Sequence, residues 1–220
     1  MRVRKKKWTD PFIKAHKSFI INDSKACFMK NKWVNVFKNQ NPIYLEIGSG
    51  KGKFLFGNAL LYPKINFIGL ETQKTPIAIG ARRIFFSHKK LNNVRLILGN
   101  ASNLKRYFSS HEIKKIFLNH SDPWPKTRHE KRRLTSSQFL KLYHYLLPRN
   151  GEIELKTDNL GFFEYSLYNF SKYNFSFSKK EISYDLHHEL GKKIYNIKSE
   201  YEEKFENMGM REFWVKVHNG

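Results

Sequence analysis

The feature that most restricts the fold of this chain is a regular alternation of short apolar runs with longer amphipathic stretches. The runs are four to six residues long, and the stretches between them are long enough to hold helices. The runs cover Ile43–Ile47, Ile65–Leu70, Val94–Leu98, Lys115–Leu118 and Glu152–Lys156. Such alternation is typical of βαβ units, in which crossover helices join parallel strands. The pattern therefore predicts an α/β fold around a mainly parallel sheet.

Apolar spacing also predicts several helices and the final strands. Ser136–Leu147 carries apolar residues at helical intervals, and the Pro-Arg-Asn-Gly segment that follows provides a stop before the next strand. Further helices are expected over Asp23–Lys38 and Phe162–Phe170, and final strands at Phe175 and Phe213–Val217. These elements complete an alternating order without an internal repeat.

The N-terminus differs from the rest of the chain because five of its first seven residues are basic. We expect residues 1–22 to form a basic arm, which could be a solvated tail or could touch RNA. Residues 23–220 are expected to form a single domain, since 220 residues are enough for one core that buries roughly 70% of the unfolded surface. Whether the protein is a monomer or a homodimer stays open.

The chain carries a large positive charge, with 41 Lys and Arg residues against 19 Asp and Glu residues and a formal charge of +22. This excess favours a polyanionic partner, although biased codon usage could produce the overall charge without producing local clusters. The single Cys27 cannot form an internal disulfide, and no apolar run approaches the roughly 18 residues of a membrane span. No histidine pair has zinc-type spacing. We therefore expect a cytoplasmic protein with no metal and no membrane partner.

A glycine-rich turn follows the first predicted strand, in the sequence Y-L-E-I-G-S-G-K-G-K from residue 44 to residue 53. Gly48, Gly50 and Gly52 allow a tight turn and let a ligand approach the backbone amides. Dinucleotide-binding loops use a related spacing around a pyrophosphate. Glu46 stands two residues before the first glycine, where it would repel a pyrophosphate but suit a cofactor with sulfonium and ammonium groups. The turn therefore predicts a nucleoside-like cofactor of that kind.

Two further polar residues lie at the ends of the next predicted strands. Glu71 ends the second strand, where an acidic residue can accept hydrogen bonds from ribose hydroxyls. Asn100 follows the third strand, where its amide could donate to or accept from an adenine edge. Each has a plainer alternative, a solvated carboxylate for Glu71 and ordinary turn chemistry for Asn100.

The strongest functional signal is the segment N-H-S-D-P-W-P-K at residues 119–126, followed directly by T-R-H-E-K-R-R-L. It places the carboxylate of Asp122 and a proline-stiffened turn beside a dense cluster of positive charge. We expect Lys126 to contact a phosphate or the base. Trp124 could stack on a base or simply pack in the core. Contacts with the RNA backbone are expected from Arg128, His129, Lys131, Arg132 and Arg133.

The glycine turn with its acidic partners resembles class I S-adenosylmethionine-dependent methyltransferases. Together with the Asp-Pro-Trp-Pro segment and its basic run, the chain from Tyr44 to Val217 resembles the bacterial tRNA (guanine-N(7)-)-methyltransferase family. The resemblance implies a Rossmann-like, seven-stranded sheet with an antiparallel last strand and helices on both faces. It also implies S-adenosyl-L-methionine as cofactor, tRNA as partner, and methylation of a guanine in the tRNA variable loop to 7-methylguanine.

Chemistry at guanine nitrogen 7 makes modest demands on an enzyme, because its lone pair is unprotonated near neutral pH. Methyl transfer then needs positioning and electrostatic stabilisation, and no general base. Asp122 follows the fourth predicted strand, at the sheet edge where ligands bind in such folds. We expect it to be the catalytic positioning group, facing both the cofactor and the guanine.

Two further segments are assigned to the substrate by the resemblance. Asp158 follows the fifth strand and matches a substrate-binding position of the family. The family's T-x-Y-E-x-x-F segment corresponds to Ser199–Phe205, with serine in place of threonine, and implies substrate contacts from Ser199, Glu200, Tyr201 and Glu202. The same residues could instead form a capping box at the start of an amphipathic helix.

Two other functions compete with this one. An amino-group methyltransferase acting on adenine or cytosine would use an acidic or amide residue followed by Pro-Pro and an aromatic residue, but here Trp124 separates the two prolines. A basic RNA-binding protein with a vacant cofactor fold would not need to keep Glu46, the three glycines, Glu71 and Asp122. Methyl transfer to tRNA guanine is therefore the leading hypothesis.

Overall fold

The computed structural model of the protein describes residues 4–87, 91–172, 177–189 and 197–220. Its backbone contacts divide the chain into two units, Met1–Ser109 and Ser110–Gly220. Each unit holds four of the described strands. No helix within the described residues is both long and apolar enough to cross a membrane.

The strands of the first unit are all parallel, as the alternating sequence pattern predicts. Their order is β1 (Ile20–Asn22), β4 (Val94–Leu98), β3 (Asn66–Glu71) and β2 (Ile43–Ile47). Every residue of β3 is buried, because β3 lies between two other strands and both faces of a parallel sheet are covered. The parallel register brings the ends of β2, β3 and β4 to one edge of this sheet.

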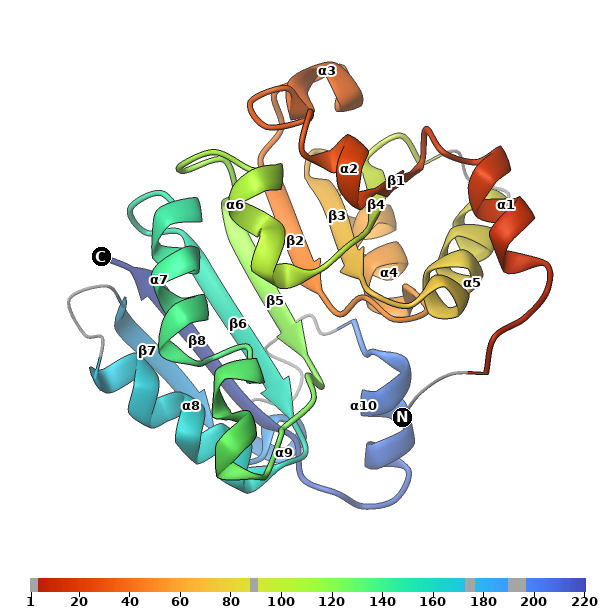
Figure 1. Ribbon diagram of the computed structural model, residues 1–220. Helices are drawn as coiled ribbons and strands as arrows, with labels where there is room; N and C mark the ends of the chain where they lie inside the picture. The colour runs from red at the N-terminus through yellow and green to blue at the C-terminus, as the bar shows by residue number, and fades with distance from the viewer. Residues whose placement is uncertain (1–3, 88–90, 173–176, 190–196) are drawn as a thin grey trace. The chain divides into compact units, whose positions relative to one another are not determined.

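Helices connect and cover these strands (Figure 1). They are α1 (Thr9–Ala15), α2 (Asp23–Ala26), α3 (Trp33–Phe37), α4 (Lys53–Leu61), α5 (Lys74–Phe85), the short 3-10 helix η1 (Ala101–Asn103) and α6 (Leu104–Tyr107). In α5 the buried residues Ile77, Ala81 and Ile84 recur at helical spacing, so one stripe of the helix packs on β3 and β4. The helix α4 contacts both β3 and α5.

The predicted single helix over Asp23–Lys38 is wrong, since two short helices, α2 and α3, occupy this stretch. Asn31 lies between them with a φ of 61°, a left-handed backbone conformation that cannot continue an α-helix. The second helix is still firmly attached to its unit. Trp33 is almost fully buried, and its indole Nε1 donates a hydrogen bond to the Tyr107 carbonyl at 3.1 Å.

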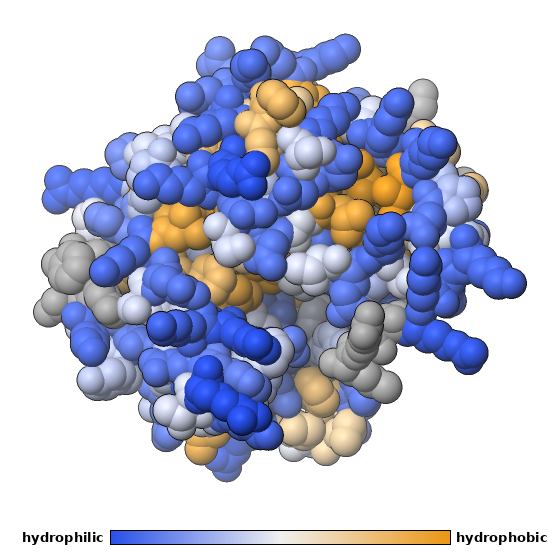
Figure 2. Space-filling model, in the orientation of Figure 1, coloured by the Kyte–Doolittle hydropathy of each residue, from blue (hydrophilic) through white to orange (hydrophobic). Residues whose placement is uncertain are grey.

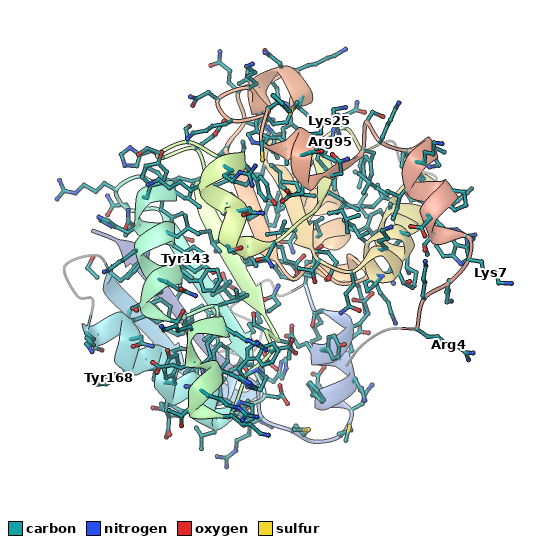
Figure 3. The ribbon with its side chains drawn as sticks, in the orientation of Figure 1. Arg4, Lys7, Lys25, Arg95, Tyr143 and Tyr168 are labelled. Atoms are coloured by element: carbon teal, nitrogen blue, oxygen red, sulfur yellow. The ribbon has the colours of Figure 1, made fainter. Side chains whose placement is uncertain are left out.

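Part of the stretch expected as a basic arm forms regular structure. The helix α1 packs on α5, and Asp10 of α1 forms an ion pair with Lys74 of α5 at 2.7 Å. Before α1, the side chains of Arg4 and Lys7 point away from the fold (Figure 3). Figure 2 shows hydrophilic side chains over most of the visible surface, as expected for a chain with a formal charge of +22. The boundary of the arm at residue 22 stays a prediction.

The second unit contains a mixed sheet. The strand β5 (Lys115–Asn119) pairs in parallel with β6 (Glu152–Thr157), and β8 (Phe213–Asn219) lies antiparallel between β6 and β7 (Phe177–Ser183). Its helical segments are the 3-10 helix η2 (Thr127–Arg132), α7 (Ser137–Leu146), α8 (Leu160–Lys172), α9 (Leu186–Glu189) and α10 (Glu200–Glu206).

Amphipathic patterning sets the orientation of α7 and α8 on this sheet. Tyr143 of α7 is fully buried with its ring turned inward, whereas Tyr168 of α8 is 64% exposed and points outward (Figure 3). Both helices lie within two residues of their predicted bounds at each end. Burial of the inward side chains is what holds each helix on the sheet.

The predicted α/β fold, its five main strands and its antiparallel last strand are confirmed. The described residues form eight strands, where the resemblance implied seven. The additional strand is β1, three residues long at the edge of the first unit's sheet, which is too short to give a clear sequence signal. Phe175, expected in one of the last strands, lies outside the described residues.

Candidate functional site

In the first unit, the glycine turn directly follows β2 and leads into α4. Gly48, Gly50 and Gly52 have φ values of 82°, 53° and 71°, which L side chains rarely adopt. The amides of Gly48 and Ser49 both donate to the Leu70 carbonyl, at 2.8 and 3.0 Å, so the turn is fastened to the end of β3. A Cβ at Gly48 would meet nothing within 4 Å. The turn therefore presents an open backbone surface that a ligand can approach.

Glu71, at the end of β3, is the second fixed point of this turn. Its Oε2 accepts a hydrogen bond from the Gly50 amide at 3.0 Å, and its Oε1 accepts one from the Gln73 amide at 2.8 Å. The side chain is only 8% exposed. The Thr72 hydroxyl also donates to Oε1, at 3.3 Å, so the acceptor capacity left for ribose hydroxyls is mainly that of Oε2. Glu46, the other predicted acidic residue, is buried near the end of β2.

Asn100 follows β4, as predicted, and caps the 3-10 helix η1. Its Oδ1 accepts hydrogen bonds from the amide and the hydroxyl of Ser102, both at 2.9 Å. These two bonds occupy the oxygen, so only the Nδ2 group of the exposed side chain is suited to donate to an adenine acceptor. The sequence had left both directions of hydrogen bonding open.

The backbone of Asn100 rests on a buried tyrosine. The Tyr107 hydroxyl donates to Asp23 Oδ1 and accepts a weak hydrogen bond from the Asn100 amide at 3.4 Å. Burial and the hydrogen bond to Asp23 raise the pKa of Tyr107 to about 12. The hydroxyl therefore stays protonated and keeps the segment after β4 in place at neutral pH.

Two glycines that the sequence reasoning missed make room for the turn. A Cβ at Gly69 of β3 would lie 2.8 Å from the Ser49 hydroxyl. A Cβ at Gly80 of α5 would lie 3.1 Å from the backbone carbon and oxygen of Lys51. Both positions let the glycine turn approach its supports closely. A glycine inside a predicted helix or strand is the signal that could have indicated such an approach.

In the second unit, the predicted catalytic residue lies on a turn with unusual backbone conformation. Asp122 is exposed and lies between His120 and Trp124, whose φ values are 49° and 42°. Trp124 is followed by Pro125, which normally drives the preceding residue toward extended backbone. The turn is therefore strained at Trp124, and it presents the Asp122 carboxylate to solvent.

The predicted RNA-binding residues do not share one environment. Arg128, Lys131 and Arg132 are exposed, as is Lys126, the predicted phosphate or base contact. His129 packs edge-on against the Trp124 ring at 5.5 Å, and the Arg132 guanidinium lies over the same ring at 4.9 Å. The half-buried Trp124 therefore belongs to the basic segment and not to the core. Arg133 is half-buried and donates hydrogen bonds to the protein's own backbone.

The segment Ser199–Phe205 forms the start of α10 with a full capping box. The Ser199 hydroxyl accepts a hydrogen bond from the Glu202 amide at 3.0 Å, and Glu202 Oε2 accepts one from the Ser199 amide at 3.4 Å. Glu202 also forms an ion pair with Lys156 at 3.3 Å, and both side chains are at most 2% exposed. Tyr201 is 48% exposed, so it differs from its buried neighbour Glu202. Their assignment as substrate contacts stays a prediction.

His120 joins the strand end before Asp122 to this helix, a role that the sequence did not reveal. Its Nε2 lies 3.0 Å from Glu212 Oε2, and its Nδ1 lies 3.3 Å from the Ser199 hydroxyl. Burial raises the pKa of Glu212, although the hydrogen bond to His120 opposes this shift. Asp158 directly follows β6 and is partly exposed.

No group of three or more His, Cys, Asp or Glu side chains suited to a metal ion is found in the part of the chain that the structure describes. The residues of the first unit do fit a nucleoside with a cationic side chain. The glycine turn faces open space at Gly48, Glu71 retains acceptor capacity on Oε2, and Asn100 offers a donor. The second unit offers an exposed carboxylate beside exposed cations.

Solved structures of other methyltransferases share this fold. A structure described as that of an antibiotic-related methyltransferase has a TM-score of 0.62 and 13% identity, and covers 86% of this chain and 92% of its own. The structure of the 16S rRNA methyltransferase KamB has a TM-score of 0.60 and 12% identity with the same coverage. At these identities the likeness shows a common fold of the class I methyltransferase type.

Sequence relatives are far more similar. A family described as putative methyltransferase matches residues 40–215. The tRNA (guanine-N(7)-)-methyltransferase of Oenococcus oeni is 54% identical over 99% of this chain and 100% of its own length. The enzyme of the same name from Leuconostoc citreum is 44% identical with the same coverage, and that from Limosilactobacillus reuteri is 46% identical over 95% of both chains. The chain therefore belongs to the tRNA (guanine-N(7)-)-methyltransferase family.

Proposed function

We propose that this protein transfers the methyl group of S-adenosyl-L-methionine to nitrogen 7 of a guanine in the variable loop of tRNA. The observation that carries this proposal is membership of the family over nearly the full length of the chain. The exposed carboxylate beside a basic segment supports it, since a base and its phosphates carry complementary groups. A tRNA substrate would place the protein in the cytoplasm.

The first unit would hold the methyl donor. Glu46 would offset the positive charge of the cofactor's methionine part, Glu71 would accept from the ribose hydroxyls, and Asn100 would donate to the adenine. The backbone of the glycine turn would line the same ligand. When bound, S-adenosyl-L-methionine supplies an electrophilic methyl group on a sulfonium.

The second unit would orient the guanine. The lone pair of guanine N7 would take the methyl group from the bound donor, whose sulfur would keep the electron pair of the broken carbon–sulfur bond, so no residue would have to remove a proton. Asp122 would accept hydrogen bonds from the guanine N1–H and amino group, and its negative charge would stabilise the positive charge that moves onto the purine. The role of this carboxylate is therefore positioning and electrostatic.

The surrounding polar residues would bind the rest of the RNA. Lys126, Arg128, Lys131 and Arg132 are exposed and suited to phosphates, because arginine and lysine neutralise the backbone without reading sequence. Tyr201 presents part of its ring to solvent and could stack on a base. Asp158, just after β6, and Glu200, the first residue of α10, would add polar contacts.

The Asp122→Ala variant tests this proposal when it is incubated with labelled S-adenosyl-L-methionine and unmodified tRNA. We expect the wild type to form 7-methylguanine, and the variant to lose transfer by about a hundredfold or more while it still binds tRNA. Glu164→Ala removes another exposed carboxylate, from α8, and is expected to leave the activity unchanged. Strong turnover by Asp122→Ala would contradict the role of Asp122, and 6-methyladenine as product would contradict the choice of base.

A further inference from the structure

Arg133 ends the basic run, yet its guanidinium is directed at the protein's own backbone. Its Nε and Nη2 donate to the Trp124 carbonyl at 3.2 and 3.1 Å, and Nη2 also reaches the Pro125 carbonyl at 3.5 Å. The guanidinium carbon lies 4.2 Å from the centre of the Tyr165 ring. Two of the three guanidinium nitrogens and the flat face of this side chain are thus used inside the second unit.

The ring beneath Arg133 is itself held in place. The Tyr165 hydroxyl donates to Glu130 Oε1 at 3.0 Å, which ties α8 to the basic segment η2. One residue further along α8, the Ser166 hydroxyl lies 2.8 Å from the Thr135 hydroxyl, and both side chains are fully buried. The Tyr165 ring is therefore a fixed platform for Arg133: its hydroxyl is held by Glu130, and its helix is held by the contact of Ser166 with Thr135.

The backbone that Arg133 holds is the strained part of the Asp122 turn. Trp124 has a φ of 42° and stands before a proline, a combination that sterics disfavour. Such a conformation persists only where surrounding contacts determine it. Two hydrogen bonds from one planar guanidinium to the Trp124 carbonyl supply such a contact, and Asp122 lies two residues before that carbonyl.

The neighbouring cations behave differently. Lys131 and Arg132 are exposed, and Arg132 lies over the face of the Trp124 ring without a hydrogen bond to its carbonyl among the described contacts. Charge alone does not separate Arg132 from Arg133, because the two are adjacent and chemically identical. Their orientation separates them.

We propose that Arg133 is a positioning residue that fixes the Asp122 turn, and that it does not contact the tRNA backbone. This inference rests on the proposed function for its effect on catalysis. It also makes a structural statement that can be tested without tRNA. The expected consequence is that loss of Arg133 harms the chemical step, whereas loss of Arg132 harms tRNA binding.

The experiment compares Arg133→Ala and Arg133→Lys with Arg132→Ala. For both Arg133 variants we expect kcat to fall by about tenfold or more, because the Asp122 carboxylate leaves its productive position. The salt dependence of tRNA binding should stay as in the wild type. For Arg132→Ala we expect a higher KM for tRNA and a slope of log affinity against log salt that is shallower by about 0.7 to 0.9. Lysine should not rescue position 133, since an ammonium cannot reproduce the planar, stacked, two-bond contact.

Hydrogen exchange of the free protein provides a readout that is independent of activity. The amides of His120 and His129 flank the turn and donate to the Lys156 and Lys126 carbonyls, both at 2.9 Å. They should exchange faster in both Arg133 variants and at the wild-type rate in Arg132→Ala. Tyr165→Leu removes the platform while keeping all cations, and it should reproduce the fall in kcat even if Arg133→Ala folds poorly. The proposal would be overturned if either Arg133 variant kept its kcat and showed a shallower slope of log tRNA affinity against log salt. Unchanged hydrogen exchange at the turn in these variants would also overturn it. A wild-type protein that does not methylate tRNA would contradict the proposed function. The exchange result would still decide whether Arg133 fixes the Asp122 turn.

Discussion

Replacing Glu202 with glutamine tests whether this residue is primarily a structural group. The substitution keeps the size of the side chain and its ability to complete the capping box, because glutamine can take the place of glutamate there. It removes the negative charge that faces Lys156 at 3.3 Å. The Lys156 side chain is 2% exposed, so its ammonium would remain in the interior with less compensation.

The expected loss follows from this burial. Removing one partner of a buried ion pair typically lowers the free energy of unfolding by 3 to 5 kcal/mol, and we expect about 3 kcal/mol here. The lower end applies because Lys156 also interacts electrostatically with Glu154 and Glu212. In a chain of this length, about 3 kcal/mol corresponds to a fall in Tm of roughly 6 to 12 °C.

Urea unfolding followed by far-UV circular dichroism, without ligands, measures this loss. The double variant Lys156→Met with Glu202→Gln removes both charges, and an apolar replacement of a buried pair is often neutral. It should recover part of the lost stability, because Glu154 and Glu212 also lose the charge of Lys156. Tyr201→Phe changes only the hydroxyl of the exposed neighbour and keeps its ring contacts with His120 and Phe205, so it should alter the free energy of unfolding by less than about 0.5 kcal/mol. A loss below about 1 kcal/mol for Glu202→Gln would refute the reasoning. Substrate contact would then be the only role left for Glu202.

Three further predictions concern the first unit. Gly80→Ala places a methyl group 3.1 Å from the Lys51 backbone and should weaken binding of S-adenosyl-L-methionine several-fold by calorimetry, whereas Gly161→Ala, with its nearest contact at 3.6 Å, should not. Hydrogen bonds from the Tyr107 hydroxyl and the Asn103 side-chain amide lower the pKa of Asp23. The contribution of Asp23 to stability is therefore present above pH 3.8 and is lost as the pH falls through its lower pKa in the folded state. The difference in urea midpoint between wild type and Asp23→Asn should therefore shrink below that pH, and a constant difference would contradict this assignment. The contribution of Tyr107 to stability is fully present below pH 10.0 and is lost as the pH rises through about 12. Alkaline titration of the phenolate absorbance in wild type and in Tyr107→Phe would detect this late-titrating tyrosine.

Local chemistry explains why the backbone of the glycine turn in the first unit could be predicted from the sequence. A glycine turn after a strand requires positive φ at fixed positions, and Gly48, Gly50 and Gly52 all adopt it. Parallel strands bring their ends to one edge, so the location of Glu71 follows from strand order. The sequence could not show that Glu71 also fastens the turn through the Gly50 amide, because that contact joins residues 21 positions apart.

The contacts of the second unit were harder to predict because they join segments that are distant in the sequence. His120 and Glu212 are 92 residues apart in sequence, and nothing local to either residue indicates the other. A lone histidine after a strand and a glutamate before one both resemble surface residues. Only the fold brings them within 3.0 Å of each other, where burial raises the pKa of Glu212.

Side-chain direction is the property that sequence patterns specify least in this protein. The basic run gives equal weight to Arg132 and Arg133, and the family motif gives equal weight to Tyr201 and Glu202. In the structure the first member of each pair faces solvent, and the second is directed inward to Trp124 or Lys156. Adjacent residues on a 3-10 or α-helix point in directions about 100 to 120° apart, so a short functional segment must send some of its side chains inward. Loss of activity in a variant of such a segment therefore does not by itself identify a substrate contact, and salt dependence or unfolding energy has to separate the two roles.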